Sequence, residues 1–171
     1  MRQKFFKSGE IKPIHGSISG YVKQEKKEKP SKFLIICPEC GVVRKNKRWY
    51  WMSDVKESER KEVSYKKCSG CEAVENQWVE GEIILKSKIL KLIPEKIESI
   101  IYDSESEYQH EDPKNRVVKI NNKSKSSWKV YTASVFLARM IGERLEREFT
   151  SKTSYKFSKG EKYVTVTWDD K

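Results

Sequence analysis

All four cysteines of the chain occur in two pairs with two residues between the members, Cys37-Pro-Glu-Cys40 and Cys68-Ser-Gly-Cys71. Four thiolates are the complete tetrahedral ligand set of a structural zinc ion, and this spacing is typical of such sites. A catalytic zinc ion would keep one position open, and four cysteines leave none. The pattern therefore predicts one structural zinc ion held by Cys37, Cys40, Cys68 and Cys71.

Paired cysteines are also compatible with two other chemistries. Disulfides need an oxidising compartment, and the N-terminal stretch MRQKFFKSGEIKPIHG lacks the apolar core of a signal peptide. A thioredoxin-like redox pair needs one cysteine of low pKa at a helix start in a βαβ setting. Two pairs with 27 residues between Cys40 and Cys68 favour zinc over both alternatives.

The segment RKNKRWYW between the two pairs combines positive charge with aromatic rings. Its cations are candidate contacts for RNA phosphates, and the alternation of Trp49 and Trp51 predicts both rings on one face of a strand. The rings either cover the zinc site or form a stacking platform for RNA bases, and the same strand can serve both purposes. The candidate RNA-binding residues here are Arg44, Lys45, Lys47, Arg48, Trp49 and Trp51.

The 171-residue chain has a formal net charge of +11, which points to an anionic partner such as nucleic acid. Residues 1–32 hold nine lysines and arginines against three acids. Their low apolar content predicts a basic flexible arm, either a solubilising tail or an RNA contact. The candidate contacts in the arm are Lys23, Lys26, Lys27 and Lys29.

The pattern changes from residue 81 onward, where no cysteine occurs. It predicts a long strand over 82–93, a helix with Pro94 in its first turn, two short strands, a helix capped by Ser134 and a closing hairpin. The order β-α-β-β-α-β-β predicts a ferredoxin-like α+β sandwich. The expected organisation is a basic arm over 1–32, a zinc ribbon over 33–80 and an α/β sandwich module over 81–171.

The start of the second helix is a further candidate RNA contact. Backbone amides and hydroxyls at a helix N-terminus attract phosphate, so Thr132, Ser134 and Arg139 are candidate RNA-binding residues, although ordinary helix capping with a surface arginine is the slightly favoured explanation. Gly142 within this helix predicts close packing against the sheet.

Taken in order, the runs CPECGVV, RWYW, CSGC, DPKNRVVKI, VYTASVFLARMIGERL and YVTVTW resemble a group of small prokaryotic zinc-ribbon proteins of uncharacterised role. These are similar to shortened relatives of the large-ribosomal-subunit export adaptor of eukaryotes, which has archaeal counterparts. The adaptor family is longer and has additional cysteine pairs. The resemblance implies binding to the ribosome or its RNA, with Cys37, Cys40, Cys68 and Cys71 matching one zinc site and Tyr131, Ser134 and Ala138 matching the segment after it.

These observations predict a cytoplasmic, non-enzymatic protein that binds rRNA and ribosomal proteins, with the large subunit favoured, in assembly, in storage or as an accessory ribosomal protein. The two histidines, His15 and His110, do not form a catalytic cluster with carboxylates, and we expect no small-molecule substrate. No run of about 18 apolar residues occurs, so no membrane partner is expected. The alternative is a zinc-ribbon adaptor that docks a transcription protein through Trp51 and Trp78.

Overall fold

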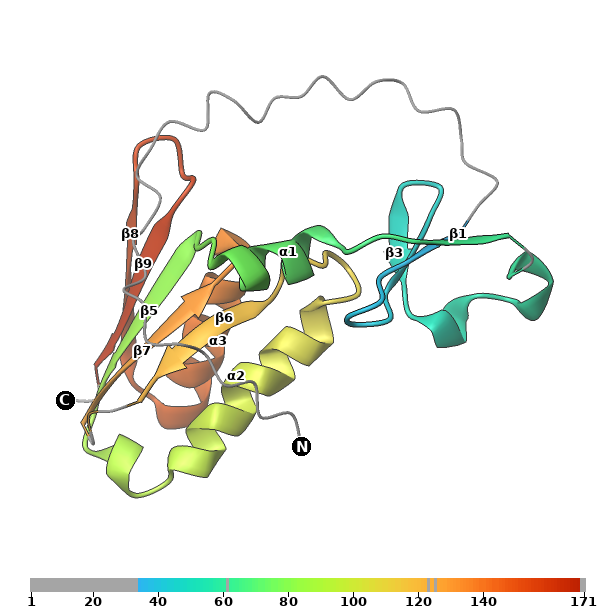
Figure 1. The fold of residues 1–171 in the computed structure, drawn as a ribbon. Coiled ribbons are helices and arrows are strands. Elements are labelled where there is room, and N and C mark those ends of the chain that lie inside the picture. Colours follow the sequence, from blue (N-terminus) through green and yellow to red (C-terminus); the bar gives the residue numbers. More distant parts are fainter. Residues whose placement is uncertain (1–33, 61, 123, 125, 170–171) are drawn as a thin grey trace.

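The computed structural model of the protein describes residues 34–60, 62–122, 124 and 126–169 (Figure 1). The arm predicted over residues 1–32, with Lys23, Lys26, Lys27 and Lys29, lies outside the described residues. The described chain contains two β-sheets and three α-helices, which confirms the α+β class.

The first sheet contains four short strands, β1 (Leu34–Ile36), β2 (Val43–Lys45), β3 (Arg48–Tyr50) and β4 (Val63–Tyr65). Their order is β3-β2-β1-β4, with β4 parallel to β1 and the other pairs antiparallel. Two 3-10 turns, η1 (Met52–Asp54) and η2 (Glu57–Glu59), connect β3 to β4. We refer to residues 34–67 as the ribbon.

The second sheet belongs to the C-terminal module, whose elements follow the predicted order β-α-β-β-α-β-β. They are β5 (Gly81–Lys86), α2 (Pro94–Tyr108), β6 (Val117–Asn121), β7 (Ser127–Thr132), α3 (Val135–Phe149), β8 (Lys152–Phe157) and β9 (Val164–Asp169). Pro94 begins α2 and Ser134 caps α3, as predicted.

The long strand predicted over 82–93 is wrong, because the strand ends at Lys86. The hydroxyl of Ser87 accepts a hydrogen bond from the Ile89 amide at 2.9 Å, which favours a turn over an extended strand. A 3-10 turn, η3 (Ile89–Lys91), follows, and it places Leu90 in the core with 2% of its surface exposed.

The strand order of the second sheet is β6-β7-β5-β9-β8. The central strand β5 pairs antiparallel with β7 but parallel with β9. In a ferredoxin-like sheet a single strand after the second helix would run antiparallel to β5. Here β8 lies at the edge and forms an antiparallel hairpin with β9, which reverses the direction of β9. The ferredoxin-like arrangement is therefore not confirmed.

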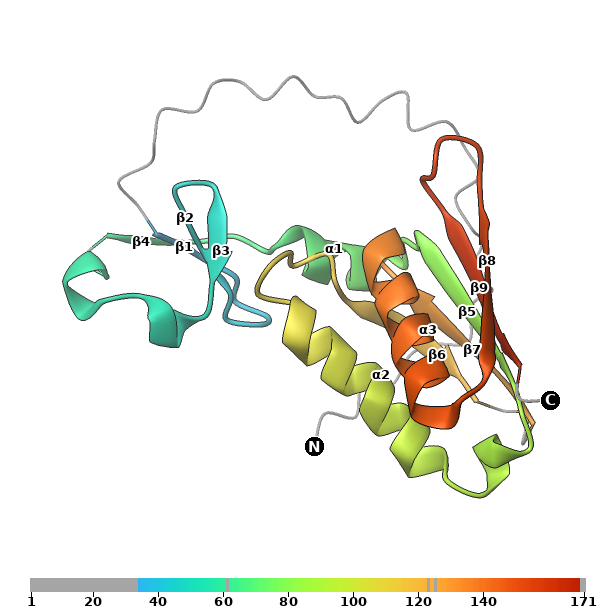
Figure 2. The same cartoon turned by 180° about the vertical axis from the view of Figure 1, so that it is seen from behind.

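Helices α2 and α3 cover one face of this sheet, the face toward the viewer in Figure 2. The core beneath them is built from alternate strand residues such as Ile83, Val166 and Trp168, together with Ile141 of α3, each 0% exposed. A Cβ atom at Gly142 would lie 2.7 Å from the Val166 side chain, which confirms the predicted close packing of this glycine.

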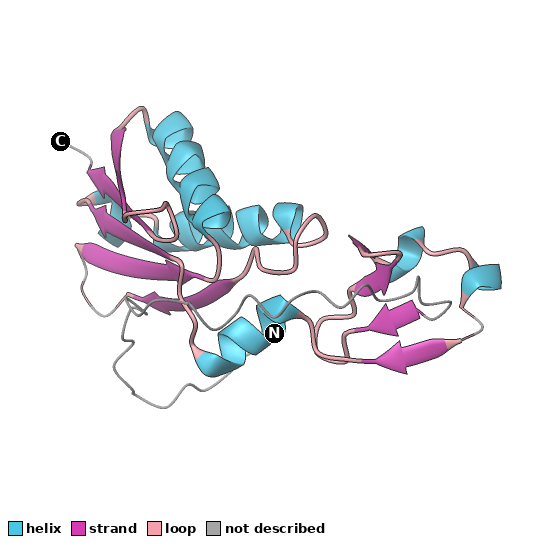
Figure 3. Ribbon diagram, turned by 90° about the horizontal axis from the view of Figure 1, so that it is seen from above, coloured by secondary structure: helices cyan, strands magenta, loops and turns pink. Residues whose placement is uncertain are grey.

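A shorter helix, α1 (Ser69–Asn76), lies on the opposite face of the sheet, near one end of β6 (Figure 3). Its Ala73 and the following Val79 pack against Val118 and Ala133, and these four residues form a small buried cluster. The helix connects the ribbon to the C-terminal module.

Candidate metal centre

The first cysteine pair lies on a tight turn between β1 and β2. The Cys37 amide donates to the Val42 carbonyl at 2.9 Å, and the Gly41 amide donates to the Cys37 carbonyl at 2.9 Å. Gly41 has a φ of +76°, a left-handed conformation that glycine adopts without steric cost. The Pro-Glu-Cys-Gly sequence thus folds Cys40 back toward Cys37.

The second pair lies on the first turn of α1 rather than on a second turn between strands. Cys68 is the N-cap residue of the helix, and its sulfur accepts a hydrogen bond from the Cys71 amide at 3.4 Å. The Cys68 amide in turn donates to the Cys37 sulfur at 3.4 Å and so joins the two pairs. The positive end of the helix dipole therefore faces the sulfur atoms, where it stabilises negative charge.

The four sulfur atoms all lie within 4.8 Å of one another. Those of Cys40 and Cys68 are 3.7 Å apart. A disulfide bond would require about 2.05 Å, and all four cysteines are free. A tetrahedron with metal–sulfur bonds of about 2.3 Å has edges of about 3.8 Å. The cluster therefore has the dimensions of a site for one metal ion with four thiolate ligands.

The protonation of the cluster favours a cation at its centre. Hydrogen bonds from the Cys68 and Cys71 thiols lower the pKa of Cys40 to about 2. The hydrogen bond to Cys40 raises the pKa of Cys68 to about 12, and hydrogen bonding to Cys40 and Cys68 raises that of Cys71 still further. Cys40 is therefore the deprotonated acceptor among these three cysteines, and a divalent cation would displace the protons of Cys68 and Cys71 on binding.

The cluster is closed to solvent on most sides. Cys37 is 1% exposed, Cys68 2% and Cys71 8%, while Val42, Trp49 and Trp51 pack around them. A site of this kind offers no open position for a substrate, so its chemistry is structural. The four cysteines predicted as ligands are thus brought together as expected.

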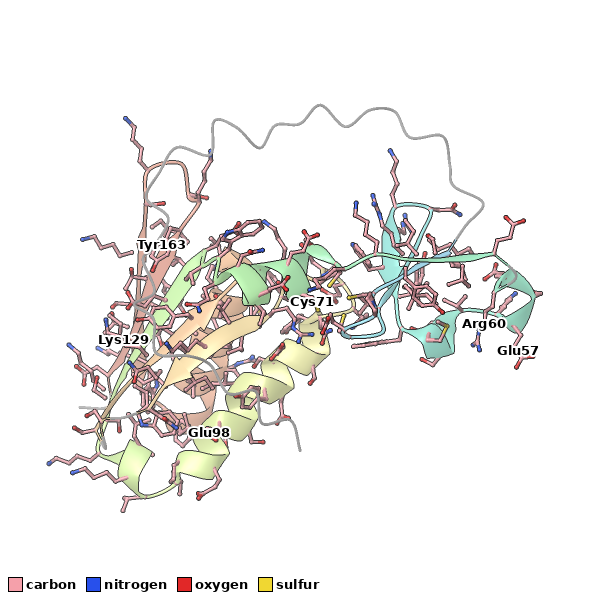
Figure 4. The ribbon with its side chains drawn as sticks, in the orientation of Figure 1. Glu57, Arg60, Cys71, Glu98, Lys129 and Tyr163 are labelled. Carbon is pink, nitrogen blue, oxygen red and sulfur yellow. The ribbon has the colours of Figure 1, made fainter. Side chains whose placement is uncertain are left out.

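The metal centre also contacts the C-terminal module, which the sequence did not predict. A Cβ atom at Gly70 would lie 1.6 Å from the Pro113 carbonyl oxygen, so the backbone of α1 lies directly against the loop before β6. In Figure 4 Cys71 lies between the ribbon and the C-terminal module. The ring of Trp51 lies 6.4 Å from that of His110, on the loop after α2.

A largely buried ion pair supports this contact from the module side. Arg116 pairs with Glu105 of α2 at 2.6 Å, and the two side chains are 16% and 13% exposed. Burial raises the pKa of Glu105, while the charge of Arg116 acts in the opposite direction. A Cβ atom at Gly70 would also lie 2.8 Å from the Arg116 side chain. The sequence signal for this packing was the glycine of Cys-Ser-Gly-Cys. Gly70 has an ordinary helical φ, so the position needs glycine for its small size and not for its backbone conformation.

The basic and aromatic residues predicted to bind RNA form the β2–β3 hairpin. Asn46 and Lys47 form its two-residue turn with φ values of 48° and 67°, and Lys45 pairs with Arg48 across it. Two successive positive φ angles are typical of a type I′ turn. Residues 46–48 are exposed, so Lys47 and Arg48 present their charge at the tip.

The other predicted residues of this segment have partners within the ribbon. The Lys45 ammonium group forms an ion pair with Glu59 at 2.5 Å. The Arg44 guanidinium lies 5.9 Å from the centre of the Trp49 ring and covers one side of it. Trp49 and Trp51 pack against the cysteines, which supports the structural interpretation of these rings.

The predicted phosphate contact at the start of α3 is not open to solvent. Thr132 is 0% exposed and donates to the Ser134 carbonyl at 2.8 Å. Ser134 is 7% exposed, accepts from the Leu137 amide at 3.0 Å and donates to the Asn115 side chain at 2.8 Å. Ser134 therefore caps the helix and Thr132 is satisfied by a backbone carbonyl, whereas Arg139 is half exposed and lies 3.6 Å from Glu143.

Comparison with known proteins returned no match to a family model, a curated protein or a solved structure. Within the part of the chain that the structure describes, no helix has the length and apolar character needed to cross a membrane.

Proposed function

We propose that this protein is a non-enzymatic rRNA-binding protein of the ribosome in which one structural zinc ion fixes a basic hairpin. The observation that carries the proposal is the exposed position of Lys47 and Arg48 at the tight turn of a hairpin whose Trp49 packs against the cysteines. The net charge of +11 and the sequence resemblance to the export adaptor family support RNA, and the large subunit in particular, as the partner.

The identity of the metal rests on its ligands. Four thiolates in a tetrahedral arrangement favour zinc or an iron–sulfur cluster over the hard cations magnesium and calcium. A Cys40–Cys68 sulfur separation of 3.7 Å fits a single ion. Zinc is therefore the metal that we propose.

The conformation of Lys47 favours a functional role for its charge. A residue with a side chain pays roughly 1 kcal/mol in the left-handed conformation, and Asn-Gly is the preferred sequence for this turn. Lysine stands where glycine would be more stable, at a φ of 67°. Strain of this kind is tolerated where a side chain is needed for function.

The test is cosedimentation with large ribosomal subunits of the source organism over a series of salt concentrations. We expect Lys47→Glu with Arg48→Glu to weaken binding at least about tenfold and to flatten its salt dependence, because fewer phosphate counterions are released. Lys56→Glu with Lys66→Glu, at exposed positions of the ribbon away from the hairpin tip, is the charge-matched control.

A second variant separates binding from folding. Lys47→Gly should stabilise the protein by up to about 1 kcal/mol, since it relieves the turn, yet weaken binding. An unchanged affinity and salt dependence in both hairpin variants would exclude the hairpin as the RNA contact.

A zinc-ribbon adaptor for a transcription protein is the second candidate. Trp78 has 38% of its surface exposed after α1, a position that suits an interface anchor, whereas Trp51 packs against the cysteines. Under this alternative the protein would remain in the soluble fraction at every salt concentration in the same sedimentation experiment.

A further inference from the structure

The second sheet has one face that α2 and α3 cover and one face that they leave open. The register of the strands places five lysines on the open face, together with two acids, Glu82 and Asp169. We call this surface the open sheet face. Its lysines are Lys86, Lys119, Lys129, Lys152 and Lys156, none of which is buried.

The charge of the covered side is opposite. Helix α2 carries five acids and one lysine, and α3 carries three acids and three arginines, so the helical layer over the core has a net negative charge. In Figure 4 Lys129 lies on the sheet and Glu98 on α2. A module with one basic and one acidic side binds a polyanion through the sheet and repels it from α2.

One row of residues crosses the whole sheet in register. It begins with Lys119 on β6, continues through Tyr131 on β7, Glu82 on β5 and Thr165 on β9, and ends with Lys156 on β8. The Glu82 carboxylate forms an ion pair with Lys129 at 2.9 Å, which neutralises the acid in the middle of the row. The row therefore has a cation at each end and an aromatic ring between them.

Tyr131 is held in place by its neighbours and still reaches solvent. The ring packs against the cluster of Ala73, Val79 and Val118 under α1, and the residue is half-buried. A ring fixed on one side and open on the other is suited to stacking against a base. Among the described residues, α1 is the helix that lies on this face, and it covers only the β6 end (Figure 3).

We propose that the open sheet face binds a single-stranded segment of RNA, with its phosphates on Lys119 and Lys156 and a base on Tyr131. This inference extends the proposed function by a second contact site, separate from the hairpin. RNA-recognition motifs use the same physical arrangement, in which a sheet backed by two helices stacks two or three bases on its free face. Residues 1–32 carry nine cations against three acids, the same sign of charge as the face, so an anionic partner complements this surface better.

The test is fluorescence anisotropy of a labelled oligoribonucleotide of about 12 nucleotides, an ordinary site size for a single-strand-binding domain. For the full chain, we expect Lys119→Glu with Lys156→Glu to weaken binding about tenfold and to reduce the salt slope by about 1.4, since each single-strand phosphate contact contributes about 0.7. Tyr131→Leu, which keeps an apolar side chain for the cluster, should also weaken binding about tenfold.

Lys91→Glu with Arg147→Glu is the matched control, because both cations are exposed and lie on η3 and α3, outside the open sheet face. Circular dichroism verifies that each variant is folded. Wild-type affinity in the folded Lys119/Lys156 variant would overturn the inference. So would a wild-type protein that binds vesicles of anionic lipid as tightly as it binds the oligoribonucleotide. If the Lys47/Arg48 variant loses binding to the ribosomal subunit while the Lys119/Lys156 variant keeps its binding, the proposed function stands without this second site.

Discussion

At the scale of single residues, Gly70 joins the metal centre to the C-terminal module through backbone contact. A Cβ atom there would lie 1.6 Å from a carbonyl oxygen of the main chain, at Pro113, which cannot rotate away as a side chain can. The contact explains why a glycine stands in the first turn of α1, where its own φ does not require one.

We therefore expect Gly70→Ala to destabilise the protein by about 2–3 kcal/mol, as overpacking in a closed site does. Urea denaturation with metal-replete protein measures the change. Gly160→Ala is the control, because Gly160 lies in an open turn with a φ of +80° and no atom within 4 Å of the new Cβ. That control should cost only about 1 kcal/mol, for the left-handed conformation. Equal costs for the two variants would contradict the contact.

Tyr163 gives a pH dependence whose sign is fixed by its surroundings. Burial, with smaller contributions from Glu82 and Tyr131, raises the pKa of Tyr163 from 10.0 to about 12. The folded protein thus favours the protonated phenol. The contribution of this residue to stability is complete below pH 10 and is lost as the pH rises toward about 12.

Wild-type protein should accordingly lose more unfolding free energy between pH 9.5 and 11.5, roughly the interval of these two pKa values, than Tyr163→Phe does. The variant has no phenol to ionise, and urea titrations at both pH values measure the difference. Identical losses in the two proteins would show that Tyr163 ionises as readily in the folded chain as in the unfolded one.

At the scale of elements, α3 is positioned by its cap. Ser134 accepts from the Leu137 amide and donates to Asn115, which is itself 3% exposed, so one hydroxyl group joins the helix to the loop before β6. We expect Ser134→Ala to cost about 2 kcal/mol, because it removes the cap and leaves a buried acceptor without this donor. Thermal unfolding measures the change.

An exposed serine on the other helix is the control for this prediction. Ser99 donates to Asp103 at the surface of α2, and Ser99→Ala should change stability by less than about 0.5 kcal/mol. Ser134→Thr, which retains a hydroxyl group, should recover part of the loss. A cost for Ser134→Ala no larger than that of the Ser99 control would contradict the role of the cap.

Local signals in the sequence predicted most elements of the C-terminal module. Pro94 and Ser134 begin helices through their own side chains, and the β8–β9 hairpin follows from its alternating pattern. The parallel pairing of β5 with β9 could not be predicted in this way, because it depends on where a distant strand lies. The same holds for the strand end at Lys86, since Leu90 packs into a core that the distant helices α2 and α3 help to build.

The candidate site shows the same division. The spacing of Cys37, Cys40, Cys68 and Cys71 was sufficient to predict the cluster, because two residues between cysteines is a local constraint. The hydroxyls of Thr132 and Ser134 suggested a surface site, yet the sequence contained no sign that Asn115 would take one of them as a partner.

At the scale of the whole molecule, the two sheets differ in the source of their stability. The C-terminal module has a core cluster of fifteen buried residues, whereas the ribbon has two small clusters, one of which contains the cysteines. We therefore expect a strand group with so little apolar burial to depend on the metal that we propose for the cysteine cluster, as small metal-binding domains do.

Removal of the metal with a chelator should therefore unfold the ribbon and leave the C-terminal module folded. Hydrogen exchange followed by mass spectrometry should show loss of amide protection in β1–β4 and retained protection in β5, β7 and β9. Cys68→Ser should reproduce the effect and reduce the metal content measured by plasma mass spectrometry, while Ser69→Ala should change neither. Simultaneous loss of protection in both sheets would show that the module also depends on the metal.

The parallel pairing of β5 with β9 also has a consequence for biosynthesis. Gly81 pairs with Val164 and Lys86 with Asp169. The centre of the sheet therefore joins β5, the first strand of the module, to β9, the last of its strands to be translated. While β9 is still inside the exit tunnel of the translating ribosome, β5 has an unpaired edge, and such edges promote aggregation. The module can close only after nearly all of it has emerged, so it should fold late in synthesis and slowly compared with the local hairpins.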